Sequence, residues 1–438
     1  MLNRLGHCCS YDDVELIDTS LAMEVIAKSE NFGVVIPTNI SPGAFVQVAA
    51  DNNDFNEETL DGKQTTHATT LVVYQRKQFG PKPKAAVHAE HSKKQRSVLV
   101  KANADIMEFG VSGKRPEVTE YKEVEDEWFQ YKTSLRSLNI QKDLGWLLMR
   151  VPPLGTDRDL QESQSVPSWS AFNTMVSDEP PPPTNVGYCP LINGSATEYS
   201  TIYTVMKYVQ SMMGALGQEH SVITFDLAMY VKAKEIQWRR PDEFKNTIIR
   251  LGGFHIALNF LTVIGKLFQD SGIEDLLIES RVYGANTTSA LLHGKSYNRG
   301  VRAHKMLCEA LHRLQWRAFI DWLASQRRQR DVEPVLGKEY AELIKACRDN
   351  STDDEVLKKS YVELCGKFRL LQPEFERFRV QSCERSKLFR FWDMYLEAVL
   401  LLLRFIRAER EGSWKLHLNA VAEMVPYFFA LDRINYAR

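Results

Sequence analysis

Three aspartates lie beside apolar runs of this sequence. Asp51 follows AFVQVAA (44–50), Asp226 follows SVITF (221–225), and Asp432 lies within MVPYFFALDRINYAR (424–438). An unpaired charge is costly next to a buried segment. Carboxylate oxygens suit Mg²⁺ or Mn²⁺, and acids gathered in one place repel one another unless a cation lies among them. The three residues are candidates for a two-ion site that activates water or a hydroxyl for attack on a phosphodiester.

The first two acids also have structural roles open to them. An aspartate after a strand often forms a turn or caps the next helix, and Asp226 is well placed to cap LAMYVKAKE. Asp54 is a loop residue in this interpretation, but it is close enough to Asp51 to compete for the first position.

The third acid has two candidates, Asp432 and Glu423. Nine residues make two and a half helical turns, so these side chains point to opposite sides of a helix and only one can serve. Asp432 has the poorer helix propensity, which favours a functional role, although an ion pair with Arg433 or Arg438 is the structural alternative.

His255 opens the helix that follows a predicted strand in LGGFHIALNFL. It is either an accessory site residue or a hydrogen-bonded core histidine. No second His or Cys lies beside it at metal-ligand spacing, and the seven cysteines form no CxxC pair, so zinc is not expected.

Length and composition describe an ordinary globular chain. Its 438 residues suggest two or three folding units, and 55 basic against 56 acidic residues give no overall sign of a nucleic-acid partner. The most apolar stretch, YLEAVLLLLRFIRAER (395–410), is interrupted by Glu397 and Arg404. It therefore predicts a buried helix, and we expect no membrane partner.

The order of the predicted elements suggests the fold. Three strands (44–50, 65–75 and 186–192) precede helix 197–217, strand 221–225, helix 227–238, strand 246–253 and helix 254–272. A three-strand meander followed by alternating helices and strands is typical of a ribonuclease H-like α/β fold, a mixed sheet with helices on both faces. In such a sheet the first and fourth strands are neighbours, which would bring Asp51 and Asp226 together.

Amphipathic spacing continues through a large all-helical insertion domain. The predicted organisation is a helical lead-in (1–40), core strands (41–75), an irregular basic and Pro-rich insertion (76–185), the second part of the core (186–272), the helical insertion (273–413) and a final core helix (414–438).

A basic cluster lies in GKSYNRGVRAHK, within the helical insertion. Its cations are Lys295, Arg299, Arg302 and Lys305. They are candidates for contacts with the DNA backbone, and a solvated helix face is the alternative.

Several long phrases resemble proteins of mobile elements in cnidarian and other animal genomes, which are divergent relatives of the DDE/D transposases. The phrases include DNNDFNEETLDGKQTTHATT, FDLAMYVKAKEIQW, HGKSYNRGVRAHKMLCEALHRLQW and MVPYFFALDRINYAR, and the resemblance covers about residues 2–438. A more distant similarity to hAT transposases places Gly252–His255 where that family has Cys-x-x-His, with glycine replacing cysteine, and Asp432 where it has Glu.

The resemblance implies metal-dependent cleavage and strand transfer on DNA, with Asp51, Asp226 and Asp432 holding two Mg²⁺ or Mn²⁺ ions. It implies a nuclear location, or a cytoplasmic one if the DNA-binding part is lost, and leaves self-association open. We find no N-terminal DNA-binding module, and the chain ends six residues after Asp432. The alternative expectation is therefore an inactive transposon-derived protein that binds DNA or other proteins.

Overall fold

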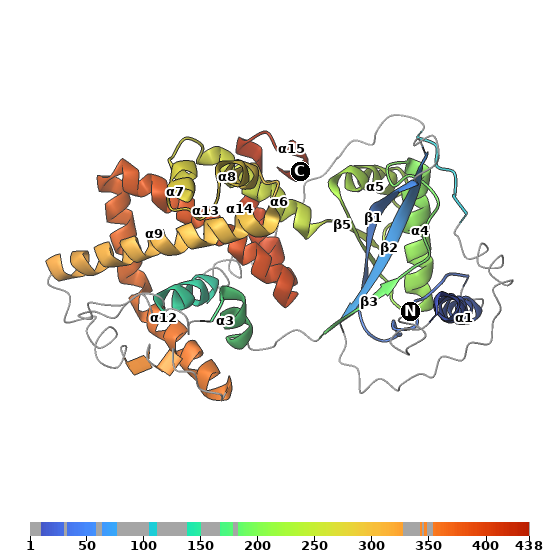
Figure 1. Cartoon of the computed structure of the whole chain (residues 1–438), viewed down its shortest axis with the longest axis horizontal. Helices are drawn as coiled ribbons and strands as arrows, with labels where there is room; N and C mark the ends of the chain where they lie inside the picture. The colour runs from blue at the N-terminus through green and yellow to red at the C-terminus, as the bar shows by residue number, and fades with distance from the viewer. Residues whose placement is uncertain are drawn as a thin grey trace. The chain divides into compact units, whose positions relative to one another are not determined.

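The computed structural model describes residues 10–29, 33–57, 64–76, 105–111, 138–149, 167–177, 183–326, 342–343, 346–347 and 354–437. The chain divides into two compact units (Figure 1). The sheet unit comprises Met1–Tyr121 and Pro181–His255, and the helical unit comprises Lys122–Pro180 and Ile256–Arg438. No described helix has both the length and the apolar character needed to cross a membrane.

The sheet unit contains a five-stranded mixed sheet in the order β3-β2-β1-β4-β5. The strands are β1 (Val46–Glu57), β2 (Gln64–Arg76), β3 (Thr184–Tyr188), β4 (Ser221–Phe225) and β5 (Thr247–Leu251). The first three form an antiparallel meander, whereas β4 lies parallel to β1 and to β5. The predicted mixed α/β character and the predicted neighbourhood of the first and fourth strands are confirmed.

The side chains of β1 point alternately to the two faces of the sheet, and those of one face are buried. Val46, Val48 and Ala50 are buried and share one core with Ile223 and Phe225 of β4. The same core contains apolar side chains from α4 (Tyr199–Ala215) and α5 (Leu227–Arg239), so these two helices pack on that face. A further helix, α1 (Tyr11–Ser29), precedes the sheet in the chain.

The opposite face of the sheet carries exposed apolar side chains. Tyr188 on β3 is 71% exposed and Ile248 on β5 is 44% exposed. Helices therefore cover one face of the sheet, as predicted. The prediction that helices cover both faces stays a prediction.

The first strand is longer than the sequence predicts. We expected it to end at Ala50 and a polar turn to begin at Asp51, but β1 continues to Glu57 and pairs with β2 along its whole length. Residues such as Asn52 and Asn53 have poor strand propensity. They are extended because the backbone of β2 lies opposite them, and this long-range pairing outweighs the local preference.

The helical unit is built from α-helices throughout its described residues. They are residues 138–148, α3 (Trp169–Met175), α6 (Gly253–Leu267, whose first turn lies in the sheet unit), α7 (Ile273–Glu279), α8 (Ala285–Leu292), α9 (Tyr297–Ser325), α12 (Asp354–Arg385), α13 (Lys387–Glu411), α14 (Trp414–Ala430) and α15 (Ile434–Ala437).

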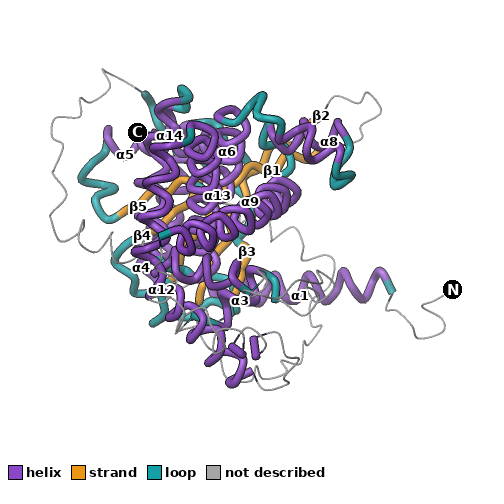
Figure 2. Tube along the Cα trace, turned by 90° about the vertical axis from the view of Figure 1, so that its left-hand side faces the viewer, coloured by secondary structure: helices purple, strands orange, loops and turns teal. Residues whose placement is uncertain are grey.

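Helix α13 lies at the centre of this unit. Figure 2 shows it beside α9, and it also contacts α12 and α14. Ser386 caps its first turn by accepting a hydrogen bond from the Phe389 amide, and Gly412 ends it with φ of 68°. Ser413 then caps α14, so a left-handed glycine followed by a capping serine reverses the chain between two packed helices.

Two expectations for this part of the chain are wrong. The segment 76–185, expected to be irregular apart from a short ordered piece in WLLMRVPPLG (146–155), contains helical residues 138–148 and α3 among its described residues, and apolar side chains of both, such as Trp146 and Phe172, are buried. The last helix does not run through Asp432: α14 ends at Ala430 and Asp432 has φ of 55°, in the turn before α15.

Candidate functional site

Asp51 on β1 and Asp226 directly after β4 occupy equivalent positions relative to two neighbouring parallel strands. The β1–β4 ladder pairs Val48 with Ile223 and Ala49 with Thr224, and each aspartate lies two positions beyond the last of these pairs. Adjacent strands are about 4.8 Å apart. Asp51 alternates with the core residues Val48 and Ala50, so its side chain lies on the face opposite α4 and α5, whereas Asp226 follows the last residue of β4 and is the N-cap of α5.

Each carboxylate makes one backbone hydrogen bond and has a second oxygen left. Asp51 Oδ1 accepts from the Asn52 amide at 2.8 Å, and Asp226 Oδ1 accepts from the Met229 amide at 2.8 Å as the N-cap of α5. Asp51 is exposed and Asp226 is half-buried. The capping role predicted as an alternative for Asp226 is present, and it leaves Oδ2 without a described hydrogen bond.

His255 lies near the same edge of the sheet, in the first turn of α6. The Gly252 amide donates to the Phe225 carbonyl at 2.8 Å, which fastens the end of β5 to the end of β4. A Cβ placed on Gly252 would lie 3.3 Å from that carbonyl oxygen and 3.4 Å from Cδ2 of His255. The glycine thus permits a close approach of the histidine ring to the strand end that precedes Asp226.

The two candidates for the third acid lie in the helical unit. Glu423 is on α14 and binds Arg404, with Nη1 at 3.0 Å from Oε1 and 3.1 Å from Oε2. Asp432 is exposed in the turn between α14 and α15. Asp51 and Asp226 belong to the sheet unit. Among the described residues, no group of three or more His, Cys, Asp or Glu side chains is arranged to hold a metal ion.

The remaining sequence candidates differ in exposure. Asp54 lies in β1 opposite His67, and its side chain is outside the described residues. Lys295, Arg299 and Arg302 are exposed, and Lys305 is half-buried. Arg299 and Arg302 are three residues apart on α9, which places them on neighbouring parts of its surface.

The structure also contains a polar cavity that the sequence interpretation missed. It lies in the helical unit and has a volume of about 590 Å³. Residues 138–148, α9, α12, α13 and α14 all contribute to its wall. Its charged lining residues are Asp143, Glu376, Arg379, Asp393, Glu397, Arg404 and Glu423.

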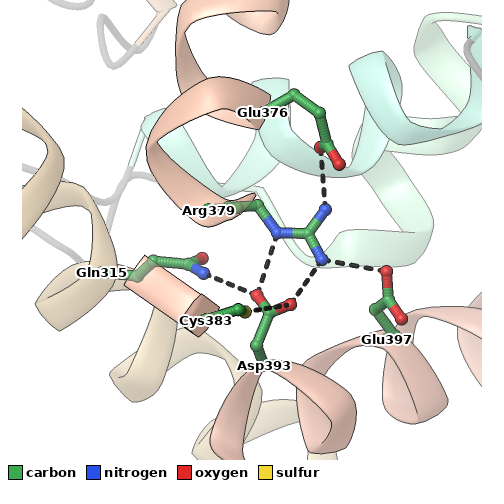
Figure 3. A network of polar contacts seen from close by, with 6 residues as sticks. All are labelled: Gln315, Glu376, Arg379, Cys383, Asp393 and Glu397. Carbon is green, nitrogen blue, oxygen red and sulfur yellow. Dashed lines mark hydrogen bonds and ion pairs between the residues drawn. The ribbon is translucent and has the colours of Figure 1, made fainter. Parts of the chain in front are cut away.

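Figure 3 shows the contacts of Arg379, which lines this cavity and binds three carboxylates. Its Nε and Nη2 donate to the two oxygens of Asp393 at 2.9 and 2.8 Å. The same guanidinium donates to Glu376 and to Glu397, each at 2.9 Å. Burial alone would lower the pKa of Arg379, but these hydrogen bonds and charges raise it.

Asp393 receives two further contacts at the same carboxylate oxygens. Gln315 on α9 donates to its Oδ1 at 3.0 Å, and Cys383 Sγ lies 3.6 Å from its Oδ2 (Figure 3). One carboxylate therefore connects α9, α12 and α13.

A third acid–arginine pair lies deeper in this unit. Arg407 Nη1 donates to Asp143 Oδ1 at 3.0 Å, and both side chains are almost completely buried. Three further residues bind this pair, since the Trp169 indole donates to Asp143 and Arg407 donates to the side chains of Asn173 and Asn139.

His312 contributes a neutral imidazole to the cavity wall. Its Nδ1 lies 2.8 Å from the Cys308 carbonyl oxygen, which assigns the proton to Nδ1. Burial lowers the pKa of His312 to about 4. At neutral pH its Nε2 is therefore a hydrogen-bond acceptor.

The sequence carries one signal for this cavity. Glu397 and Arg404 interrupt the most apolar stretch of the chain, and charges within a buried helix require partners. The partners, Arg379 and Glu423, lie on other helices and have no fixed sequence spacing to these charges, so only the folded arrangement identifies them.

Comparison with protein-family models gives a match. A family model described as a domain of unknown function, DUF8702, matches residues 168–438, which is more than half of the chain. The match covers β3, β4 and β5 of the sheet unit and most of the helical unit. Neither the curated proteins nor the solved structures contain a match.

Proposed function

We propose that this chain, which belongs to the DUF8702 family, is a metal-dependent phosphodiester nuclease and strand-transferase of the transposase type, acting on DNA. The observation that carries the proposal is the equivalent place of Asp51 on β1 and of Asp226 directly after β4, each two positions beyond the last pair of the parallel β1–β4 ladder. The strand order β3-β2-β1-β4-β5, with an antiparallel meander first, supports a ribonuclease H-like fold.

The two aspartates suit a hard divalent cation. Each offers a carboxylate oxygen beyond the one used in a backbone hydrogen bond. Mg²⁺ or Mn²⁺ bound there would activate the attacking oxygen and stabilise the leaving oxygen of a phosphodiester. The half-buried position of Asp226, fixed by its capping bond, holds its carboxylate in one orientation. His255 would be an accessory residue at the same edge.

We assign the contacts with the DNA backbone to a group of lysine and arginine side chains that are mostly exposed. Lys295, Arg299 and Arg302 would contact phosphates at the beginning of α9, with Lys305 as a partly buried neighbour. A nuclear location follows from a DNA substrate and is part of the same proposal.

Incubation of the purified chain with Mn²⁺ and supercoiled plasmid tests the proposal. We expect nicking by the wild type and none by Asp226→Asn, because asparagine preserves the helix cap but removes the charge that binds the metal. Asp242→Asn is the matched control, since Asp242 is exposed elsewhere in the sheet unit. Nicking that persists in Asp226→Asn would refute the proposed site.

The same nicking assay distinguishes the two candidates for the third acid, Asp432 and Glu423. Asp432→Asn should abolish nicking if the sequence assignment is right. Glu423→Gln should do so if that residue is the ligand, although loss of its ion pair with Arg404 makes a stability measurement necessary alongside.

An inactive protein that binds DNA or other proteins is the second candidate. It is favoured by the ion pair that engages Glu423 and by the place of Asp432 in an exposed turn. Thermal unfolding with and without Mn²⁺ separates the two. A melting temperature that Mn²⁺ raises in the wild type but not in Asp51→Asn supports the metal site, whereas equal behaviour supports the inactive candidate.

A further inference from the structure

We propose that Thr70 is a positioning residue for Asp51: its hydroxyl donates a hydrogen bond to the Asp51 carboxylate when a divalent cation is bound at the sheet edge. The inference rests on the proposed function, because it requires Asp51 to be a ligand of Mg²⁺ or Mn²⁺. Thr70 lies within TTHATTLVVYQ (65–75), a run whose residue types indicate a strand and no chemistry.

Strand pairing places Thr70 beside Asp51. The β1–β2 ladder sets the two residues directly opposite each other, and such pairs have Cβ atoms about 4.5–5.5 Å apart on one face of the sheet. Leu71, the next residue of β2, belongs to the core that α4 and α5 cover, so Thr70 lies on the opposite face together with Asp51. At this separation, rotation about side-chain bonds brings a threonine hydroxyl to a carboxylate oxygen.

The hydroxyl of Thr70 has no partner among the described residues. Its Oγ1 is buried and makes no hydrogen bond, although the residue as a whole is half-buried. A buried hydroxyl without a hydrogen bond destabilises the folded state, whereas valine has nearly the same shape and no polar atom to satisfy. The strand by itself gives no reason for a threonine here. A hydrogen bond that forms when the site is occupied supplies one.

Asp51 is the carboxylate that needs a second donor. Asp226 is half-buried and held as the N-cap of α5, whereas Asp51 is exposed and its one described hydrogen bond comes from the next residue, Asn52. Carboxylates that bind a metal are themselves held by hydrogen bonds, and losing such a bond weakens metal binding by about 10–100-fold. A carboxylate has about four acceptor positions, so Thr70 and Asn52 together can hold Asp51 and leave an oxygen for the cation.

Calorimetric titration of the full chain with MnCl₂ tests the inference without relying on DNA cleavage. We expect Thr70→Val to raise the Kd for Mn²⁺ by at least about tenfold. Thr70→Ser keeps the hydroxyl and should bind Mn²⁺ nearly as tightly as the wild type. Wild-type affinity in Thr70→Val, or equal weakening in both variants, overturns the inference.

Thermal unfolding without metal separates positioning from a structural role. Thr70→Val should melt at the wild-type temperature or above it, because valine removes an unpartnered buried hydroxyl and suits a strand. A lower melting temperature together with weaker Mn²⁺ binding would assign Thr70 to the fold and contradict the positioning role.

Thr288→Val is the matched control. Thr288 Oγ1 of α8 is also buried without a described partner, but the residue belongs to the helical unit. The same chemical change there should leave the Kd for Mn²⁺ at its wild-type value. A Kd that rises equally in Thr288→Val and Thr70→Val would count against a local effect at Asp51.

Asp51→Asn distinguishes failure of this inference from failure of the proposed function. If the wild type and Thr70→Val bind Mn²⁺ equally while Asp51→Asn does not bind it, only the role of Thr70 is wrong. If the wild type binds no Mn²⁺, or Asp51→Asn binds it as the wild type does, the metal site itself is refuted and the role of Thr70 is refuted with it.

Discussion

Arg407 and Asp143 form a buried ion pair across 264 positions of the chain, with 3.0 Å between Nη1 and Oδ1. Arg407 is among the largest fully buried side chains of the described structure. The pair connects α13 to the helical residues 138–148, and its hydrogen bonds with Trp169 and Asn173 extend that connection to α3.

Arg407→Met should destabilise the chain by about 3–5 kcal/mol, because it leaves the Asp143 charge buried without its partner. Urea denaturation followed by circular dichroism measures the change. Arg390→Met is the control on the same helix, and it should stay within about 0.5 kcal/mol because Arg390 is exposed. The double variant Arg407→Met/Asp143→Leu should recover most of the loss. A single variant as stable as wild type would mean that Asp143 is solvated in solution.

Gly265→Ala should be strongly destabilising, and Gly366→Ala should not. A Cβ on Gly265 of α6 would lie 1.8 Å from the backbone oxygen of Leu292, so the end of α8 would have to move. Gly366 of α12 has no atom within 4 Å of such a Cβ, and alanine there should stabilise the helix by about 0.5–1 kcal/mol. Thermal unfolding of both variants measures the change in melting temperature, which should be negative for Gly265→Ala and positive for Gly366→Ala. Equal changes would contradict the packing of α6 against residue 292.

The cap on α5 predicts a graded series at Asp226. Asp226→Ala should cost about 1 kcal/mol, since the Met229 amide loses its acceptor, while Asp226→Asn should cost little. Glu198, the N-cap of α4, makes no side-chain capping hydrogen bond, so Glu198→Ala should be close to neutral. Chemical denaturation of the three variants ranks their free energies of unfolding. An asparagine variant as unstable as the alanine one would show that the charge, and not the cap, holds the helix.

Two buried histidines make stability dependent on pH. Burial lowers the pKa of His304 and of His312 to about 4. Between pH 6.5 and pH 4 the unfolded chain binds protons that the native chain does not, so stability should fall as the pH is lowered through this window. The groups facing His312 include Cys308, Arg379 and Asp393, and Tyr395 hydrogen-bonds His304.

Denaturation at pH 6.5 and pH 5 measures this effect, which should be on the order of 1 kcal/mol per histidine. His304→Gln should flatten the dependence relative to wild type. His293→Gln should not, because His293 is exposed. If both variants show the wild-type slope, the carboxylates alone account for it.

The sequence predicts the sheet unit best where local signals agree with the fold. The run SVITF matches β4 at both ends, and the cap that the sequence offers as the alternative role of Asp226 is present. The extent of β1 was not predictable, because Asn52 and Asn53 favour turns and are extended only through pairing with β2. Tertiary pairing overrides propensity there.

One of the two candidate sites was predictable from the sequence and the other was not. Adjacency of Asp51 and Asp226 follows from element order, since a strand order with the first and fourth strands adjacent brings those positions together. The cavity around Arg379 and Asp393 depends on how five helical segments pack, and no periodicity within one of them encodes its partners on the others. The role of Asp432 as third acid stays a prediction.

The two units are interleaved along the chain, since each is assembled from segments on both sides of a segment of the other. A ribosome therefore releases β1 and β2, then helical residues that have no finished partner, and only afterwards β4, the parallel neighbour of β1. Until β4 emerges, one edge of the nascent sheet is unpaired and open to other chains. A gene fragment that begins at residue 168 would leave the other side of this pairing open permanently, because it would encode β4 without β1.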